Sequence, residues 1–296
     1  MLLSPSLPKP ANRPPVSSPL YKNISDIIMS RRNINILLHN YLKNLILINL
    51  LLSLYCWIII SVSTILFGIF AVVTSFVNPE ISHITARMWG GFILKLCGVR
   101  VNVSGEENIP KEDNGKFYII TSNHQSYFDI FILLKNLKMD FRFIAKKSLF
   151  GIPVLGQSMK RLGYIPMERD NLRSAYESVK ESIQNLKSNS SILIFPEGTR
   201  SSDGNLNNFK RGGLNMLLRQ KGACVLPVAI IGSINVLKKN SILIHPGREV
   251  ELHILQPVII DDKKTNKNKY DMLIEEIENR TRAAISSSKE TTICLP

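Results

Sequence analysis

An uncharged stretch of 36 residues, from Asn44 to Pro79, restricts the fold more than any other part of the sequence: NLILINLLLSLYCWIIISVSTILFGIFAVVTSFVNP. A bilayer crossing needs about 20 apolar residues, so this stretch is longer than one upright span and shorter than two full ones. A tilted single helix, or two shorter helices that form a hairpin in one leaflet, would both fit. We therefore expect residues 34–80 to be embedded in a membrane rather than buried in a soluble core.

Basic residues flank the apolar stretch on both sides. They are Lys22, Arg31, Arg32 and Lys43 before it, and Arg87, Lys95 and Arg100 after it. Because basic flanks favour the cytoplasmic side, a single crossing cannot satisfy both of them. The pattern favours a re-entrant helical hairpin, with Gly68 or the polar cluster Ser61, Ser63 and Thr64 near its bend, and a single span stays open as the alternative.

The net charge alone does not identify a partner. Lys and Arg outnumber Asp and Glu by 37 to 23, giving +14, which suits nucleic acid, an anionic membrane surface or a phosphorylated substrate. Nucleic-acid binding has no supporting motif and does not explain the apolar stretch, so we expect a lipid bilayer as partner and no nucleic acid. Residues 1–33 form a basic segment whose first 20 residues are rich in Pro and Ser, and we expect a disordered tail there.

The four cysteines, Cys56, Cys97, Cys224 and Cys294, lie far apart and show no metal-ligand spacing. A disulfide framework or a zinc site is therefore not indicated, and reduced thiols facing a cytoplasmic environment are expected.

Residues 81–296 have the pattern of an α/β domain. A helix is predicted at 171–188, where apolar residues recur every three or four positions, and another at about 268–285. Their alternation with strands indicates a mixed, largely parallel sheet flanked by helices. Strands are predicted at 117–121, 141–145, 191–196, 224–231, 241–246 and 249–255.

His124 and Asp129 lie five residues apart in TSNHQSYFD, between two apolar runs. On one regular helix they would point to nearly opposite sides. They meet only if His124 lies in the turn after the strand and Asp129 in the first helical turn, with Ser122 and Asn123 as turn and N-cap residues. A carboxylate there can accept the Nδ1 proton of the imidazole and leave Nε2 as a general base. On spacing alone, Asp129 as a helix cap beside an exposed His124 explains the pattern equally well.

Two further stretches carry residues suited to anion binding. FPEGTRS (195–201) ends a strand with Glu197, Gly198, Thr199 and Arg200, and the guanidinium fork of arginine suits phosphate. FIAKKSLFGIPVLGQSMKRLGYIPMER (143–169) places Lys146 and Arg169 among apolar residues. Taken singly, each stretch also has a purely structural interpretation. FPEGTRS could be a strand-ending turn with a surface ion pair, and the basic residues of 143–169 could be solvated charges beside an apolar helix.

In this order, NHQSYFD, AKKSLFGIPVLG…RLGYIPMER, FPEGTRS and LPVAI (226–230) resemble the four motif blocks of the glycerolipid acyltransferases. These are the H-x4-D enzymes typified by bacterial 1-acyl-glycerol-3-phosphate acyltransferase. The resemblance covers roughly residues 85–255, and the apolar segment before it is similar to the membrane anchor of that family.

The resemblance implies acyl transfer from acyl-CoA or acyl-carrier protein to the 2-hydroxyl of lysophosphatidic acid. It implies that His124 is the general base and Asp129 its orienting partner. Lys146 and Arg200, with Arg169, would bind the acceptor phosphate, while Glu197, Gly198 and Thr199 shape the pocket. No metal or organic cofactor is implied, and the G-x-S-x-G elbow of serine hydrolases is absent.

The expected location is the inner, cytoplasmic membrane with the site on the cytoplasmic face, because the acceptor is a lipid and the donor carries a soluble headgroup. Two alternatives remain. The first is an acyltransferase for another acceptor, such as a different lysophospholipid, lyso-ornithine lipid or a lipid A precursor. The second is a non-catalytic membrane lipid-binding protein with the same fold.

Overall fold

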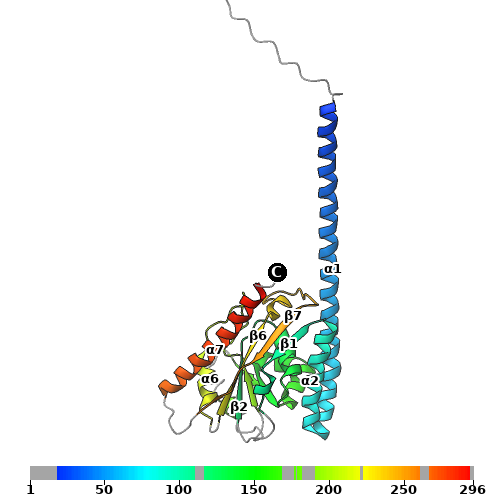
Figure 1. Ribbon diagram of the computed structural model, residues 1–296. Helices are drawn as coiled ribbons and strands as arrows, with labels where there is room; N and C mark the ends of the chain where they lie inside the picture. Colours follow the sequence, from blue (N-terminus) through cyan, green and yellow to red (C-terminus); the bar gives the residue numbers. More distant parts are fainter. Residues whose placement is uncertain are drawn as a thin grey trace, which may run out of the picture. The chain divides into compact units, whose positions relative to one another are not determined.

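The computed structural model describes residues 19–110, 117–168, 177, 179–181, 191–220, 223–260 and 267–293. The chain divides into two compact units, Met1–Leu50 and Leu51–Pro296. Within the second unit, the last part of helix α1 lies with the α/β elements that follow it (Figure 1).

Helix α1 (Pro19–Val77) runs without interruption through the apolar stretch, and α2 (Pro79–Leu96) follows after Asn78. The bend expected near Gly68 or the Ser61–Thr64 cluster is not present. Ser63 and Thr64 donate to the carbonyl of Ile60 in the preceding turn, so the helix satisfies these hydroxyls without opening. Gly68 instead allows close packing, because a Cβ there would lie 2.7 Å from a methyl of Val154.

The start of α1 also differs from the predicted tail at 1–33. Residues 1–18 lie outside the described residues, but the helix already begins at Pro19. No Gly or Pro occurs between Pro19 and Gly68, and proline is well suited to the first helical position. The helix therefore extends upstream from the apolar stretch through 19–33.

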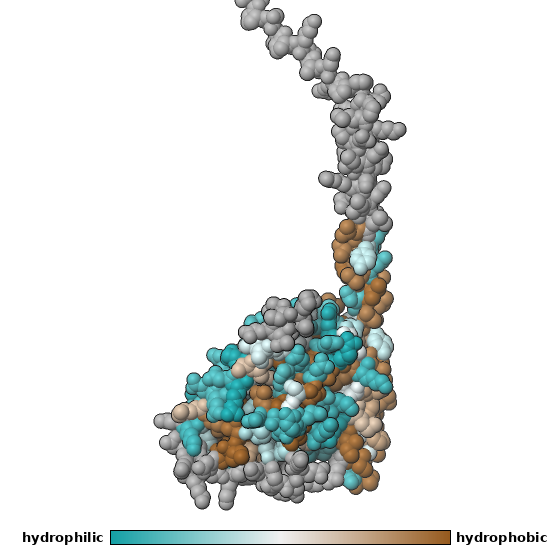
Figure 2. All heavy atoms as spheres, viewed as in Figure 1, coloured by the Kyte–Doolittle hydropathy of each residue, from teal (hydrophilic) through white to brown (hydrophobic). Residues whose placement is uncertain are grey.

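Within Leu38–Val77, α1 contains an 18-residue stretch with a mean hydropathy of 2.5, and no other helix among the described residues is long and apolar enough to cross a membrane. Within the second unit its small and polar residues face inward: Ser53, Cys56 and Ser63 are at most 4% exposed. Large apolar side chains such as Leu54 and Leu66 are more than half exposed. Figure 2 shows this part of α1 as mainly hydrophobic, in contrast to the largely hydrophilic face of the α/β elements. This arrangement is typical of a helix that faces lipid.

Eight strands of the described chain form one sheet in the order β1-β7-β6-β2-β5-β3-β4, with β8 paired to β6. The pairs β1–β7, β2–β6, β2–β5, β3–β5 and β3–β4 are parallel, and β6–β7 and β6–β8 are antiparallel. The predicted mixed, largely parallel sheet is confirmed. The strands are β1 (Arg100–Ser104), β2 (Phe117–Ser122), β3 (Phe141–Lys146), β4 (Ile165–Met167), β5 (Ser191–Ile194), β6 (Ala223–Ile231), β7 (Glu249–Ile254) and β8 (Val258–Ile259).

Helices cover both faces of this sheet (Figure 1). Alternate residues of the central strands enter two core clusters, because successive side chains of a strand point to opposite faces. Ile120, Leu193 and Leu226 pack with α2 and α3 (Phe128–Asn136), and their neighbours Ile119, Ile192 and Val225 pack with α6 (Arg211–Leu218) and α7 (Lys267–Ile293). The remaining elements are α4 (Leu155–Arg161) and the 3-10 helices η1 (Glu106–Asn108), η2 (Lys147–Gly151) and η3 (Ser233–Asn235).

One predicted strand, 241–246, is wrong. Its backbone is irregular because its hydrogen bonds go elsewhere: the Ile242 carbonyl accepts from Ser53 and Trp57 of α1, and His245 N–H donates to Val236. The predicted helix at 171–188 lies almost entirely outside the described residues. Cys56, Cys97 and Cys224 are buried, and Cys294 is not described.

Candidate active site

The candidate residues come together because three parallel strands end at one edge of the sheet. β2 pairs with β5 and β5 with β3, all parallel. The turn after β2 carries His124, FPEGTRS follows β5, and β3 ends at Lys146. Carboxyl ends of parallel strands are where α/β folds collect their sites.

His124 and Asp129 are in direct contact. Nδ1 of His124 lies 2.8 Å from Oδ2 of Asp129, and the Asp129 side chain is fully buried. The same Oδ2 accepts the backbone N–H groups of Gln125 (2.7 Å) and Ser126 (2.9 Å). Since two amides already donate to this oxygen, the imidazole must donate as well, so Nδ1 carries the proton and Nε2 is left with its lone pair.

Asp129 does not cap α3. The residue before the helix is Tyr127, which has no side-chain capping bond, and Asp129 bonds back to the turn that carries His124. Asn123, expected as the N-cap, instead exchanges two 2.7 Å hydrogen bonds with the backbone of Ile230 on β6. The turn is therefore attached to the sheet, and α3 begins only at Phe128.

The second oxygen of Asp129 is held from a distant part of the chain. The hydroxyl of Ser233, in η3, donates to Oδ1 at 2.5 Å, and Ser233 is fully buried. Four groups of the protein thus donate to this carboxylate: Nδ1 of His124, the N–H groups of Gln125 and Ser126, and the hydroxyl of Ser233. Asp129 is positioned by its surroundings and in turn fixes the orientation of the imidazole.

The FPEGTRS turn holds the backbone of His124 from both sides. His124 N–H donates to Oε1 of Glu197 at 2.6 Å, and the His124 carbonyl accepts from Ser201 N–H at 2.7 Å. Phe195 stacks on the imidazole, with ring centroids 4.0 Å apart. The first and third motif blocks are therefore one structural unit.

Glu197 faces the protein rather than the open edge of the site. Its other oxygen accepts from the N–H and the side-chain amide of Asn207, at 2.9 and 2.7 Å. Burial raises the pKa of this carboxyl, against the opposing effect of the donors from Asn207 and His124. Glu197 shapes the site by holding His124 and Asn207.

The guanidinium carbon of Arg200 lies over the ring of Tyr127, 3.7 Å from the ring centroid. This cation–π contact joins the two motif blocks again. Thr199 beside it is exposed. Gly198 has φ of +70°, and a Cβ there would lie 3.0–3.2 Å from the side chain of Lys210. Lys210 is thus a further basic residue over the same turn.

Lys146 ends β3 at the same edge of the sheet and is exposed. It is one strand further out than the FPEGTRS turn, and the structure shows no contact between it and His124 or Arg200. Arg169 lies outside the described residues.

Four residues of this site were not among the predicted ones: Asn123, Tyr127, Lys210 and Ser233. Tyr127 and Asn123 lie inside the NHQSYFD block, but the contact of Tyr127 with Arg200 joins residues far apart in the sequence and has no local signal. Ser233 is 104 residues from Asp129, and nothing local in the sequence indicates the contact.

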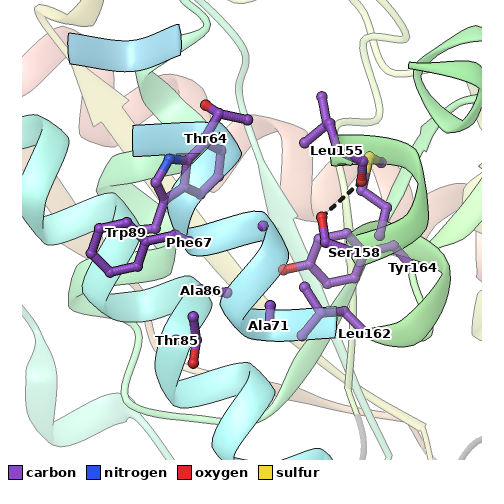
Figure 3. Close-up of a pocket in the computed structure, with 12 residues that line it drawn as sticks. Thr64, Phe67, Ala71, Thr85, Ala86, Trp89, Leu155, Ser158, Leu162 and Tyr164 are labelled. Atoms are coloured by element: carbon purple, nitrogen blue, oxygen red, sulfur yellow. Dashed lines mark hydrogen bonds between the residues drawn. The ribbon is translucent and has the colours of Figure 1, made fainter. Parts of the chain in front are cut away.

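A recess lies elsewhere, between α1, α2 and α4, and encloses about 380 Å³ including the part open to solvent. Figure 3 shows Phe67 and Trp89 on one side of it and Leu155, Ser158 and Tyr164 on the other. None of its lining residues belongs to the candidate active site.

Comparison with known proteins identifies the family of the chain. A family model described as Acyltransferase matches residues 100–231, which include every site residue predicted from the sequence but not Ser233. A 1-acyl-sn-glycerol-3-phosphate acyltransferase of Borreliella burgdorferi is 34% identical over 175 residues, covering 59% of this chain and 68% of that protein. The chain belongs to the acyltransferase family.

Two further proteins of known name are similar to this chain. The crystal structure of the 1-acyl-sn-glycerophosphate acyltransferase PlsC from Thermotoga maritima matches with a TM-score of 0.66 and 30% identity. The match covers 81% of this chain and 96% of that one. The chloroplastic 1-acyl-sn-glycerol-3-phosphate acyltransferase LPAT1 of Arabidopsis thaliana is 33% identical over 200 residues. This chain spans about half the length of that relative, 52%, and of its Brassica napus counterpart, 54%.

Proposed function

We propose that the protein transfers an acyl chain from a thioester, acyl-CoA or acyl-carrier protein, to the sn-2 hydroxyl of 1-acyl-glycerol-3-phosphate. The product is phosphatidic acid, and the reaction belongs to phospholipid biosynthesis. The names of the related proteins support this acceptor. Those names do not specify the acyl donor, so acyl-CoA and acyl-carrier protein are both part of the proposal.

The observation that carries the proposal is the His124–Asp129 pair. With Nδ1 protonated and bonded to Asp129, Nε2 is the free basic atom. As the acceptor hydroxyl attacks the thioester carbonyl, Nε2 removes its proton. The tetrahedral intermediate then collapses, the carbon–sulfur bond breaks, and the proton returns from Nε2 to the leaving thiol.

No acyl-enzyme is needed in this scheme, because the acceptor oxygen attacks directly. Ser122 and Ser126 are the hydroxyls nearest to His124 in sequence, and they donate to the carbonyls of Asn123 at 3.0 Å and Leu237 at 2.9 Å, respectively. The thioester donor is the co-substrate, and the proposal uses no metal or organic cofactor.

Recognition of the acceptor phosphate is assigned to Arg200 and Lys146, with Arg169 as a further predicted ligand. Stacking on Tyr127 restrains the guanidinium of Arg200, so less freedom is lost when its N–H groups bind phosphate. Lys210 lies over the same turn.

We further propose that the protein resides in the inner, cytoplasmic membrane with the site on the cytoplasmic face. The long apolar helix supports membrane association, and the basic residues that follow it, Arg87, Lys95 and Arg100, favour the cytoplasmic face for the α/β part. A membrane-impermeant thiol reagent added from the periplasmic side should not modify a cysteine placed at the exposed position of Met272 on α7. Modification there would overturn the orientation.

An acceptor panel tests the function. Membranes containing the protein are supplied with labelled acyl-CoA or acyl-carrier protein, and with lysophosphatidic acid, another lysophospholipid or lyso-ornithine lipid. We expect the highest kcat/KM with lysophosphatidic acid. Preference for another acceptor would replace the proposed substrate. No transfer to any acceptor would favour the lipid-binding alternative.

A further inference from the structure

Residues 233–244 connect the candidate catalytic pair to the apolar helix. At one end of this segment, Ser233 donates to Asp129, and the carbonyl of Leu237 accepts from Ser126. At the other end, the carbonyl of Ile242 accepts from Trp57 Nε1 at 2.7 Å. A single short segment therefore contacts both the turn that carries His124 and the membrane-candidate helix.

The segment is attached to α1 through its backbone. Ser53 Oγ donates to the Ile242 carbonyl at 3.1 Å and accepts from Ile244 N–H at 3.0 Å. The side chain of Ile244 is buried in the core, whereas that of Leu243 is 38% exposed and that of Ile242 is 76% exposed. The turn is thus held in place while most of the Ile242 side chain stays exposed.

Apolar side chains are exposed on α1 as well. Next in sequence to Ser53 and Trp57, which bond to the loop, Leu54 and Ile58 are 56% and 52% exposed. The helix and the loop that it bonds to thus both expose apolar side chains, and exposed apolar surface of this kind marks an interaction site.

The charge next to this loop identifies the partner. Lys238 is exposed and Lys239 is half-buried, and both lie shortly before Ile242 in the sequence. Apolar side chains that enter the acyl region, beside lysines that reach the headgroups, suit an anionic bilayer surface. A protein partner would have to match both the loop and the adjoining face of a helix that is itself apolar enough for lipid.

We propose that residues 238–243 form a second membrane contact beside α1. In this contact Ile242 and Leu243 insert at the bilayer surface, and Lys238 and Lys239 bind anionic headgroups. Because the same segment bonds to Asp129 and Ser126, this contact brings the candidate catalytic pair close to the membrane surface. The benefit for catalysis rests on the proposed function, whereas the lipid contact does not.

Depth-dependent fluorescence quenching tests the contact without measuring acyl transfer. A cysteine at Ile242 is labelled with an environment-sensitive dye in the full chain carrying Cys294→Ser, since Cys56, Cys97 and Cys224 are buried. The matched control is the same label at Met272, which is 70% exposed on α7. The proteins are reconstituted into phosphatidylcholine vesicles with and without phosphatidylglycerol, and with nitroxide groups on the acyl chains.

We expect a blue-shifted emission at position 242 and quenching several times that at 272. Replacing Lys238 and Lys239 by glutamine should lower the quenching in the vesicles that contain phosphatidylglycerol. Equal, weak quenching at the two positions would overturn the lipid contact, as would a label at 242 shielded from both water and lipid, which would indicate a protein partner.

A second variant connects the contact to activity. Ile242→Ser should lower acyl transfer to lysophosphatidic acid in vesicles several-fold and leave transfer to a short-chain, water-soluble lysophosphatidic acid unchanged, with Met272→Ser as control. An equal loss with both acceptors would contradict the membrane role. Failure of the acceptor panel, by contrast, would leave the quenching result standing.

Discussion

The hydroxyl of Ser233 donates a hydrogen bond to Oδ1 of Asp129, 104 residues earlier in the chain. The bond attaches the carboxylate that orients His124 to a segment whose other end bonds to Trp57 on α1. The candidate catalytic pair is therefore positioned by three elements: its own turn, the FPEGTRS turn and the segment after β6. Each of these can be tested separately.

Ser233→Ala removes the hydroxyl that donates to Oδ1 of Asp129, so this buried carboxylate oxygen loses that hydrogen bond. A hydrogen bond to a charged group contributes about 1.5–3 kcal/mol, so we expect kcat to fall by about 10- to 100-fold. KM for both substrates should change little, because Ser233 lies behind Asp129.

Ser233→Thr retains the hydroxyl and is the matched control, and it should restore most of kcat. The pH profile of kcat/KM should also shift in Ser233→Ala and return toward that of the wild type in Ser233→Thr. Steady-state kinetics in which Ser233→Ala equals the wild type would show that this bond does not position Asp129.

Glu197→Gln replaces one carboxylate oxygen with an NH₂ group. The oxygen lost is either the one that accepts from two N–H donors of Asn207 or the one that accepts from the N–H of His124. One buried donor then loses its acceptor, which costs about 1–3 kcal/mol of unfolding free energy. Activity should fall as well, because the His124 backbone is no longer held.

Glu249→Gln provides the comparison, since Glu249 pairs with Arg100 in an exposed ion pair. Thermal unfolding in detergent micelles should show a change of less than about 0.5 kcal/mol for that variant. Equal midpoints for Glu197→Gln and Glu249→Gln would contradict the positioning role of Glu197.

Burial raises the pKa of Glu197 above its ordinary 4.5 in the folded protein. The folded state therefore retains this proton to a higher pH than the unfolded chain does. The stabilisation is complete below pH 4.5 and is lost as the pH rises through the raised pKa. Unfolding midpoints of the wild type should thus decline relative to Glu197→Gln over that range. A constant difference between the two proteins, or one of opposite sign, would contradict the raised pKa.

Arg200→Ala should weaken binding of acceptors that carry a phosphate. Loss of charge-assisted hydrogen bonds of about 1.5–3 kcal/mol raises their KM by roughly 10- to 100-fold. A phosphate-free lysolipid should be affected little. Arg280→Ala, on α7 and paired with Glu276, is the control for charge. An equal loss with both kinds of acceptor would mean that Arg200 does not bind the phosphate.

Local patterns predicted the central strands of the sheet but not β1, β4 or β8. β2, β3, β5, β6 and β7 lie within one or two residues of their predicted ranges, because apolar β-branched runs between turn residues identify buried strands. The turn between β2 and α3 followed from the same reasoning, since five-residue spacing allows His124 and Asp129 to meet only across a turn.

Long-range contacts were not predictable from these patterns. The run SILIHP has the composition of a strand, but Ser53 and Trp57 take up the hydrogen bonds of Ile242 and keep it out of the sheet. The start of α1 depends on the length of chain free of Gly and Pro, rather than on apolar content alone. Ser233 has no local signature, because its partner lies on a different strand–helix unit.

Replacement of His124 tests the central claim most directly. General-base catalysis by a positioned side chain contributes about 10²–10⁴ in rate. We therefore predict that His124→Ala lowers kcat for acyl transfer to lysophosphatidic acid at least 100-fold, while its membrane association stays unchanged. His39→Ala, which alters an exposed histidine on α1, should retain full activity. Acyl transfer by His124→Ala near the wild-type rate in purified membranes would contradict the account.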